Sequence, residues 1–383
     1  MNRLIRSLLA LMLMSSVIFV IPSRVGESSQ KTSVTVFEDR EVAPRDLNAG
    51  LEKSDLVFHP MKSGSYGENW FFLVMLEDGG WIASAFATTN LGIGKFRSSV
   101  DFTYYAADGT IHRFHRIYSK KHLKTSEDSF SVKIGQNYAG GEFPNYRLVI
   151  DEKELQAELN FICLTKGWKP GDGFLYLGAG KKEFWKFAAP APRSKVTGHI
   201  MIDGKKVGLK GLGHHDHSYA NIKKTSYTKV QYVFRMFTEE FTLSLMSIVL
   251  RDEYERDSAN MLMLAQDDKI IFNTTEFSYV PSRFKPDKDT GYRVPYQFEL
   301  KASGSGASPE PAFSLEGKIE IEHLLERCDV LEHIGSLQRS FVKAFISKPY
   351  LYRFQSGYDL NLKVGDQTRH LTGKGFSEAN FMD

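Results

Sequence analysis

The sequence predicts an all-β protein built from two consecutive antiparallel units, and three observations support this fold class. Asp-Gly pairs repeatedly separate runs in which apolar and polar residues alternate, which is typical of tight β-hairpins. The spacing of apolar residues changes to that of an amphipathic helix in one segment near the C-terminus, so strand patterns account for most of the rest of the chain. A proline-rich stretch at residues 188–192 lies near the middle of the 383 residues and leaves two parts that each suit one antiparallel barrel or sandwich.

Strand-like runs follow one another through most of the chain after a polar segment at residues 27–50. Asp-Gly turns join three predicted hairpins, at residues 70–87, 100–118 and 196–212. Further predicted strands lie at residues 146–164 (two strands around an acidic turn), 230–237, 241–250, 261–265, 270–272, 292–300, 313–321, 352–364 and 368–376. So many hairpins leave sheet edges that must be hidden, and closed barrels or stacked sheets are therefore expected.

One segment, at residues 330–346, carries apolar residues at three- and four-residue steps. These residues are Ile334, Leu337, Phe341 and Phe345. The spacing predicts one amphipathic helix near the C-terminus that ends before Pro349.

The first 26 residues have the pattern of an export signal. Arg3 and Arg6 precede an apolar run at residues 8–21, which suits a signal peptide or an uncleaved signal anchor. Either form predicts export to the periplasm or the cell exterior. The predicted organisation is a leader at 1–26, an N-terminal barrel at 27–192 and a C-terminal barrel at 193–383.

Charge and composition exclude several classes of protein. The 49 Lys+Arg and 46 Asp+Glu residues give a net charge of +3, which is too small for a nucleic-acid binder. Removal of Arg3, Arg6 and Arg24 with the leader brings the charge to about zero. Two cysteines rule out a disulfide-rich scaffold, whereas 28 Phe, 17 Tyr and 4 Trp can line a cavity for an apolar ligand. A small hydrophobic ligand is the expected partner; peripheral membrane contact and the oligomeric state stay open.

Three histidines and one aspartate fill positions 214–217, directly after the second strand of the 196–212 hairpin. A two-residue turn would set Ile200 opposite Val207, with both on the apolar face. Continued alternation then points His215 and His217 inward and the other two residues outward. A bulge at one of the nearby glycines would exchange the two pairs.

The cluster suggests three kinds of chemistry. A buried Asp216 with a raised pKa suits proton donation, with His215 and His217 as tuning or relay groups. Alternatively, Asp216 accepts hydrogen bonds from backbone N–H groups, and the histidines are structural residues of the barrel wall with their own hydrogen-bond partners. A metal is the third alternative, and it would need a further ligand such as His199 or His115.

Two basic residues elsewhere are candidates for pocket positions. Arg235 is flanked by aromatic residues, and it is either a satisfied arginine at a barrel end or an anchor for a polar ligand group. In the 100–118 hairpin, a two-residue turn would put Arg113 and His115 on the apolar face with Phe102. Those two residues are then either pocket residues or the sign of a shifted register, and a core or rim histidine is the simpler interpretation.

Four segments together resemble the CrtC/AttH-like superfamily. The central one is VTGHIMIDGKKVGLKGLGHHDHSYAN at residues 196–221, which matches a strand, a DG turn and the G-x-G-[YH]-H-D-H-x-[WY]-[GA] pattern. The others are ENWFFLVMLEDGG at 68–80, FRMF at 234–237 and LTGKGFSEANF at 371–381. The four matches span most of the chain after the leader, in the expected order.

This resemblance implies two lipocalin-like β-barrels side by side and a large cavity for polyene, isoprenoid or lipid-like molecules. The superfamily includes carotenoid hydratases (hydroxyneurosporene synthases), fungal Diels–Alderases, tocopherol cyclase relatives and a fungal stress-survival group associated with lipid handling. It implies an enzyme without a cofactor or a bound metal that hydrates, isomerises or cyclises its substrate through Asp216, His215 and His217; the leader adds the expectation that this enzyme is exported. The substrate-binding candidates are His214, Tyr219, Asn221, Tyr232, Arg235, Trp70 and His115. The alternatives are a non-catalytic lipid or isoprenoid carrier of the same fold, and a metal-dependent protein that uses the histidine cluster.

Overall fold

The structure, a computed structural model, describes residues 31–38, 50–90, 96–304, 312–332 and 348–382. The predicted leader lies outside these residues, and so does most of the predicted helix at 330–346. Within the described ranges, no helix combines the length and apolar character needed to cross a bilayer. Residues Thr32–Asp383 form one compact unit.

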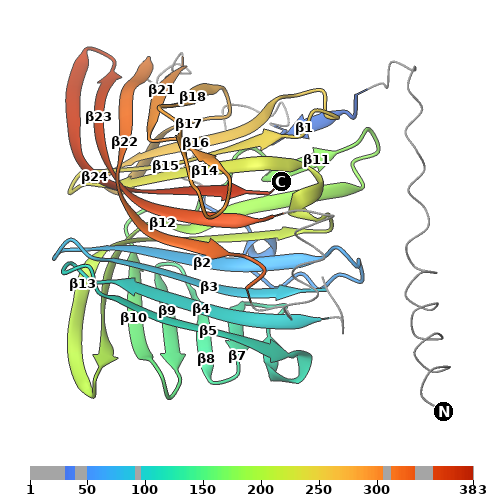
Figure 1. Ribbon diagram of the computed structural model, residues 1–383, viewed down its shortest axis with the longest axis vertical. Helices are drawn as coiled ribbons and strands as arrows, with labels where there is room; N and C mark the ends of the chain where they lie inside the picture. The colour runs from blue at the N-terminus through green and yellow to red at the C-terminus, as the bar shows by residue number, and fades with distance from the viewer. Residues whose placement is uncertain (1–30, 39–49, 91–95, 305–311, 333–347, 383) are drawn as a thin grey trace. The chain divides into compact units, whose positions relative to one another are not determined.

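The first sheet comprises thirteen antiparallel strands in the described part of the chain (Figure 1). Their bounds are β1 (Val34–Val36), β2 (Gly67–Leu76), β3 (Trp81–Thr89), β4 (Arg97–Tyr105), β5 (Ile111–Ser119), β6 (Leu123–Thr125), β7 (Phe130–Ile134), β8 (Asn137–Glu142), β9 (Asn145–Asp151), β10 (Gln156–Cys163), β11 (Phe174–Leu177), β12 (Glu183–Ile202) and β13 (Lys205–Ala220). The strand order is β5-β4-β3-β2-β13-β12-β10-β9-β8-β7-β6, and β11 joins β1 to β12.

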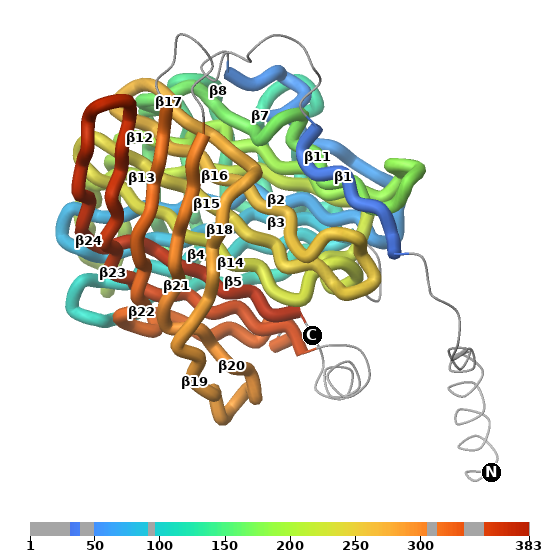
Figure 2. The backbone as a smooth tube through the Cα atoms, turned by 90° about the horizontal axis from the view of Figure 1, so that it is seen from above, coloured from blue at the N-terminus to red at the C-terminus, as the bar shows by residue number. Residues whose placement is uncertain are grey.

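The second sheet contains nine antiparallel strands among the described residues, in the order β17-β16-β15-β14-β24-β23-β22-β21-β18. Their bounds are β14 (Thr228–Phe237), β15 (Phe241–Leu250), β16 (Ser258–Gln266), β17 (Lys269–Thr274), β18 (Phe277–Ser282), β21 (Gln297–Gly304), β22 (Phe313–Asp329), β23 (Tyr350–Val364) and β24 (Gln367–Phe381). The short hairpin of β19 (Lys285–Pro286) and β20 (Arg293–Val294) projects from the rim of this sheet (Figure 2).

Each sheet curls into a nearly closed barrel because its two edge strands are neighbours in the chain. The 3-10 turn η2 (Lys120–His122) connects edge strand β5 to edge strand β6, and only two residues separate β17 from β18. Tyr118 of β5 also accepts a hydrogen bond from Asn137 of β8 and donates one to Glu152, so side chains bridge the open seam. Closure hides backbone groups that a free edge would expose. The predicted all-β class with two lipocalin-like barrels is confirmed.

Alternation along the strands sorts side chains into barrel interiors and a shared interface. In β2, Trp70 and Phe72 face the first barrel's core, whereas Phe71 and Leu73 face the second sheet. In β14, Phe234 fills the second barrel, while its neighbours Val233 and Arg235 point toward the first sheet. The two sheets lie against each other (Figure 1), and mostly apolar side chains fill the interface between them.

The hairpin at 196–212 has the register that its two-residue turn predicted. Ile200 pairs with Val207, and Gly198 pairs with Leu209. Its strands are much longer than predicted, because β12 begins at Glu183 and β13 continues to Ala220. The proline-rich stretch at 188–192 lies inside β12, where it coincides with irregular pairing to β13. The change of sheet comes after β13 rather than at residue 192, so the histidine cluster belongs to the first barrel and not to the second.

The register of the 100–118 hairpin differs from the one expected. Phe102 pairs with Phe114, while His115 lies opposite Asp101 on the other face. The reason is the turn, which is longer than two residues: the Ala106 N–H donates to the Thr110 carbonyl, and the Gly109 N–H donates to the Ala106 carbonyl. A shift of one residue exchanges the two faces of a strand, so His115 leaves the apolar face.

Candidate functional site

Strand β13 runs through the middle of the first sheet, between β12 and β2. Its register places His215 opposite Phe72 of β2 and Ala191 of β12. His215 and His217 contact the aromatic side chains of the barrel interior, as the alternation predicted, whereas Asp216 faces the second sheet. The four residues of the cluster therefore divide into separate environments.

Asp216 is the centre of a buried polar cluster between the two sheets. Its Oδ2 atom accepts hydrogen bonds from Arg235 Nη2 of β14 at 2.7 Å and from His214 Nε2 at 3.1 Å. Burial raises the pKa of Asp216, but the hydrogen bond from His214 and the charge of Arg235 outweigh burial, so the pKa lies below its ordinary value. The sequence had suggested a raised pKa for Asp216, because Arg235 approaches this carboxylate only in the folded protein. The lowered pKa favours the carboxylate form of Asp216.

His214 and Arg235 complete this inter-sheet cluster. Burial and the Arg235 charge lower the pKa of His214, whose Nε2 atom faces Asp216 Oδ2 and whose Nδ1 atom lies 3.3 Å from the Pro192 carbonyl oxygen. The Arg235 guanidinium also lies over the Phe71 ring, 5.3 Å from its centroid. Its Nε and Nη1 atoms have no hydrogen-bond partner among the described residues. Asp216 and Arg235, which the sequence suggested as separate site residues, are thus brought together in a salt bridge between the barrels.

His215 lies in an aromatic box inside the first barrel. Its ring stacks on Phe72 at 4.1 Å and on Phe130 at 5.0 Å between ring centroids, with Tyr146 at the edge. The Nδ1 atom donates to the backbone carbonyl of Phe71 at 2.9 Å, which leaves Nε2 as a buried acceptor with no partner in the described structure. Burial lowers the pKa of His215 to about 3. His215 is therefore a buried ring within the aromatic core of the first barrel.

His217 belongs to a third environment, at the end of the barrel. Its Nε2 atom lies 2.8 Å from Glu68 Oε1, and its Nδ1 atom donates to the Asp55 backbone carbonyl at 2.9 Å. His59 also faces Glu68, with 3.4 Å between Nδ1 and Oε1. Burial raises the pKa of Glu68, but hydrogen bonds from His217, His59 and Tyr66 lower it to about 2. Glu68 is therefore a buried carboxylate between two imidazoles.

Charged groups behind this end of the barrel hold its backbone in place. Asp55, in the 3-10 turn η1 (Lys53–Asp55), is fully buried and pairs with Lys169 at 2.7 Å and Lys186 at 2.6 Å. Burial raises the pKa of Asp55, and the two lysines lower it below its ordinary value. These ion pairs fix the turn whose carbonyl groups orient the histidines.

The remaining predicted residues do not converge on one site. Trp70 stacks on His217 at 5.2 Å, and Tyr219 stacks on His59 at 3.9 Å, so both belong to the Glu68 environment. Tyr232 lies in the core of the second barrel. Asn221 binds backbone groups of residues 182 and 184 beyond the end of β13.

The two further ligands suggested for a metal lie elsewhere. His115 bonds Asp101 at 3.1 Å between Nδ1 and Oδ2, near the second sheet. His199 lies opposite Glu158, near the C-terminal end of β12. Neither residue joins the group at positions 214–217.

Glu68 and His59 are functional candidates that the sequence analysis missed. Glu68 had a signal, since it opens the 68–80 motif and precedes Trp70 by two positions on the same face of β2. His59 had no recognisable signal in the sequence, because it lies in a loop and contacts Glu68 only in the folded protein.

A cleft of about 790 Å³ opens beside the other half of β13, where the two sheets meet. Its apolar residues are Met75, Leu76, Leu164, Val196 and Leu212, and its polar and charged residues are Glu77, Arg193, Lys195, Thr197, Lys210, Glu239, Asp267 and Asp268. Arg193, which is buried, bonds Thr242 Oγ1 at 2.6 Å and the Thr238 carbonyl at 3.2 Å, so it ties β12 to the β14–β15 turn. None of the predicted site residues lines this cleft.

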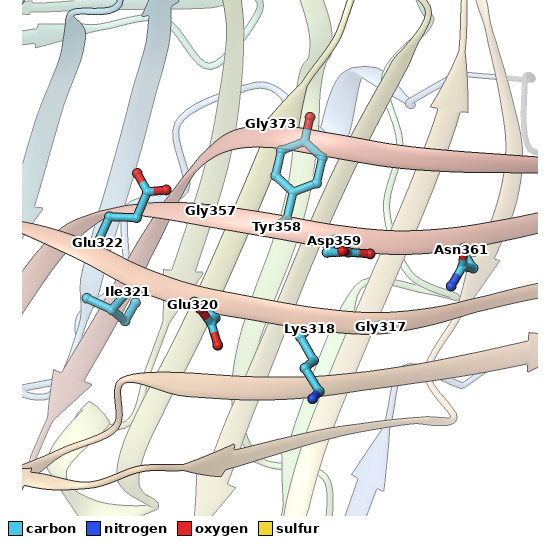
Figure 3. A pocket seen from close by; sticks show the side chains of 10 residues that line it. All are labelled: Gly317, Lys318, Glu320, Ile321, Glu322, Gly357, Tyr358, Asp359, Asn361 and Gly373. Atoms are coloured by element: carbon cyan, nitrogen blue, oxygen red, sulfur yellow. The ribbon is translucent and has the colours of Figure 1, made fainter.

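A second depression of about 690 Å³ lies over β22, β23 and β24 (Figure 3). Its lining is largely polar and includes Lys318, Glu320, Glu322 and Asp359, with Tyr358 beside Gly373. It has fewer apolar groups than the cleft between the sheets, and it is a weaker candidate for a hydrophobic ligand.

Comparison with known proteins gives a family. The sequence model of the Svf1 family matches residues 45–383. The ceramide-binding protein svf1 of Schizosaccharomyces pombe is 26% identical over 204 residues, which is 53% of this chain and 52% of that protein. The ceramide-binding protein svf1 of Emericella nidulans is 21% identical over 290 residues, 72% of this chain and 75% of that protein. The chain thus spans about half the length of the first relative and three quarters of the second.

Solved structures show the same fold at low sequence identity. A putative AttH from Nitrosomonas europaea superposes with a TM-score of 0.60 and 14% identity, over 88% of this chain and 99% of that one. CghA in complex with Sch210972 gives a TM-score of 0.57 and 13% identity, over 92% and 99% of the two chains. The resemblance to CrtC/AttH-like proteins is therefore confirmed for the fold. Since the family match extends from residue 45 to residue 383 and includes both barrels, the chain belongs to the Svf1 family.

Proposed function

We propose that this protein binds a neutral lipid of the ceramide type in the cleft between the two sheets. The observation that carries the proposal is the cleft itself, with a volume of about 790 Å³ and an apolar base. Clefts of roughly 300–1,000 Å³ that are lined mainly by apolar groups are the usual sites for lipid-sized ligands.

The base of the cleft suits hydrocarbon chains. Val196 and Leu76 are buried, while Leu212, Leu164 and Met75 are partly accessible and offer apolar surface to a ligand. Covering this surface with an acyl chain removes it from water, at roughly 25 cal/mol per Å².

The rim of the cleft suits an uncharged polar headgroup. Glu239, Asp267 and Lys195, which carry opposite charges, are all among the residues that line the cleft. Lys210 is paired with Glu77 at 2.9 Å. Amide and hydroxyl groups can bond to acceptors and donors together, whereas an anionic headgroup would meet carboxylates. The names of the family members, which are ceramide-binding proteins, support the same class of ligand.

Binding is favoured over acid catalysis by the state of Asp216. An ionised carboxylate in a salt bridge with Arg235 cannot protonate an alkene unless the pair is broken. The function proposed is therefore that of a carrier or receptor for lipid, which is the alternative that the sequence analysis set beside an enzyme.

The test is a titration of the full chain with a ceramide that carries a fluorescent acyl chain. We expect saturable binding, and we expect Leu212→Gln to weaken it about tenfold or more, because burying a leucine contributes roughly 1.5–3 kcal/mol. The matched control is Val280→Gln, an apolar residue on β18 that is 52% exposed and lies outside the cleft. A phosphatidylserine with the same fluorescent chain should bind more weakly.

Two results would contradict the proposal. Absence of saturable ceramide binding by the wild type would overturn the function. If Leu212→Gln and Val280→Gln weaken ceramide binding equally, the ligand does not bind in the cleft.

We also propose that residues 1–26 direct the chain into the export pathway, on the basis of their basic start and apolar run. Cell fractionation of the full chain and of a chain starting after residue 26 tests this. Retention of both in the cytoplasm would exclude export.

A further inference from the structure

We propose that His59, Glu68 and His217 form a binding site for a divalent transition metal of the zinc type. Nothing in this proposal depends on lipid binding. Two imidazoles and one carboxylate are a ligand set that zinc uses when a coordination position stays open. The sequence hypothesis of a metal at the histidine cluster named other partners, and only His217 is shared with it.

The ligand atoms have the spacing that such an ion requires. One nitrogen of each histidine and a carboxylate oxygen of Glu68 all lie within 4.8 Å of one another. His217 Nε2 is 2.8 Å and His59 Nδ1 is 3.4 Å from Glu68 Oε1. Ligands about 2.0–2.1 Å from a tetrahedral ion lie roughly 3.3 Å apart. The His59–Glu68 pair already has this spacing, and the His217–Glu68 pair must separate by about 0.5 Å to admit an ion.

The second nitrogen of each histidine supports this assignment. His59 Nε2 donates to the Ser54 carbonyl at 2.8 Å, and His217 Nδ1 donates to the Asp55 carbonyl at 2.9 Å. Histidines that bind metals usually donate their other N–H to a carbonyl or carboxylate, which fixes the ring and its tautomer. Here two consecutive carbonyls of one turn orient both rings so that their remaining nitrogens face Glu68.

Glu68 is oriented in the same way. Its Oε2 atom accepts a hydrogen bond from the Tyr66 hydroxyl at 2.6 Å, and the His59 backbone N–H also donates to it at 3.0 Å. Oε1, the atom nearest both histidines, is thereby turned toward the site. Trp70 stacks on His217 at 5.2 Å with 7° between the rings, which restricts movement of that ligand.

The site is buried on one side and accessible on the other. The side chains of Glu68 and His217 are 0% and 1% exposed, whereas that of His59 is 19% exposed. An ion can therefore enter beside His59, and water or a ligand oxygen can take the open position.

The test is a zinc titration of the purified full chain against a chromophoric chelator, together with thermal unfolding. We expect one zinc ion per chain and a higher midpoint temperature with zinc. His59→Ala should weaken zinc binding by roughly a hundredfold or more, since loss of a second-shell partner already costs about 10–100-fold. The matched control is His370→Ala, which removes a histidine that is also bonded to one carboxylate, Asp359, at 2.8 Å.

Cobalt gives an independent readout that needs no variant. Co²⁺ in a site with two imidazoles should show visible d–d absorption of a four- or five-coordinate ion, and zinc should abolish it. Sub-stoichiometric zinc binding by the wild type, or equal zinc affinity in wild type and His59→Ala, would overturn the proposal. Circular dichroism of His59→Ala verifies that the variant is folded.

Discussion

The salt bridge between Asp216 and Arg235 connects the two barrels. It joins β13 of the first barrel to β14 of the second at 2.7 Å, inside a mostly apolar interface. A buried ion pair adds little net stability, but removal of one partner leaves the other charge without compensation. Its role is therefore to set how the two barrels align.

This role predicts a large effect of Asp216→Asn on stability. The variant leaves the Arg235 charge buried, and we expect a loss of about 3–5 kcal/mol in the free energy of unfolding, measured with urea. The control is Asp128→Asn, at an exposed pair with Lys53 where Asp128 is 91% exposed; it should cost less than about 1 kcal/mol. Similar costs for both variants would argue against the structural role.

Asp101 predicts how stability falls in acid. Burial raises its pKa, but the hydrogen bond from His115 and the charges of Arg353 and Arg113 lower it below the ordinary 3.8. Below pH 3.8 the unfolded chain binds the proton first, so this contribution to stability is present above 3.8 and is lost as the pH falls through the folded pKa.

Asp101→Asn should therefore flatten the dependence of the unfolding free energy on pH in that acidic window. Urea unfolding at a series of pH values below about 4 measures the slope. An unchanged slope in Asp101→Asn would show that another carboxylate is responsible.

At the scale of elements, β13 depends on close contact with β2. A Cβ atom at Gly211 would lie 2.0 Å from the backbone oxygen of Met75, which cannot move without disturbing the sheet. Glycine here allows the two backbones to approach.

Gly211→Ala is expected to destabilise the protein by about 1–3 kcal/mol, as overpacked sites do. Gly208→Ala in the same strand is the matched control, because a Cβ there meets nothing within 4 Å. Chemical denaturation of both variants gives the comparison. Equal stability of the two would contradict the close approach at Gly211.

At the scale of the molecule, the interface predicts that the two barrels unfold together. Apolar clusters connect them on both sides of the Asp216 cluster, including Phe71 with Phe237 and Phe376 on one side and Phe187 with Val233 on the other. Separation of the barrels would expose these groups to water.

We expect a single thermal transition by calorimetry, with equal calorimetric and van't Hoff enthalpies. Two resolved transitions would show that the barrels are independent. The first barrel expressed alone should expose its interface and bind a hydrophobic dye.

Local sequence patterns predicted much of the fold, whereas contacts between residues far apart in the chain were harder to predict. Residues 203–204 set a two-residue turn, so the pairing of Ile200 with Val207 followed from the sequence. The turn before Ile111 is longer, and the face of His115 was therefore predicted wrongly. The proline-rich stretch indicated a boundary, yet β12 continues through it with an irregular register.

The sequence by itself determined the all-β class, the main hairpins and the alternation that separates His215 and His217 from Asp216, because these depend on neighbouring residues. Only the tertiary structure decided which groups meet across the fold. It brought Arg235 to Asp216 from another strand, so that the carboxyl is ionised, and it brought His59 and Glu68 to His217. The pKa of a side chain and the ligands around an ion depend on neighbours in space, and the order of residues along the chain does not specify them until the barrels close and pack.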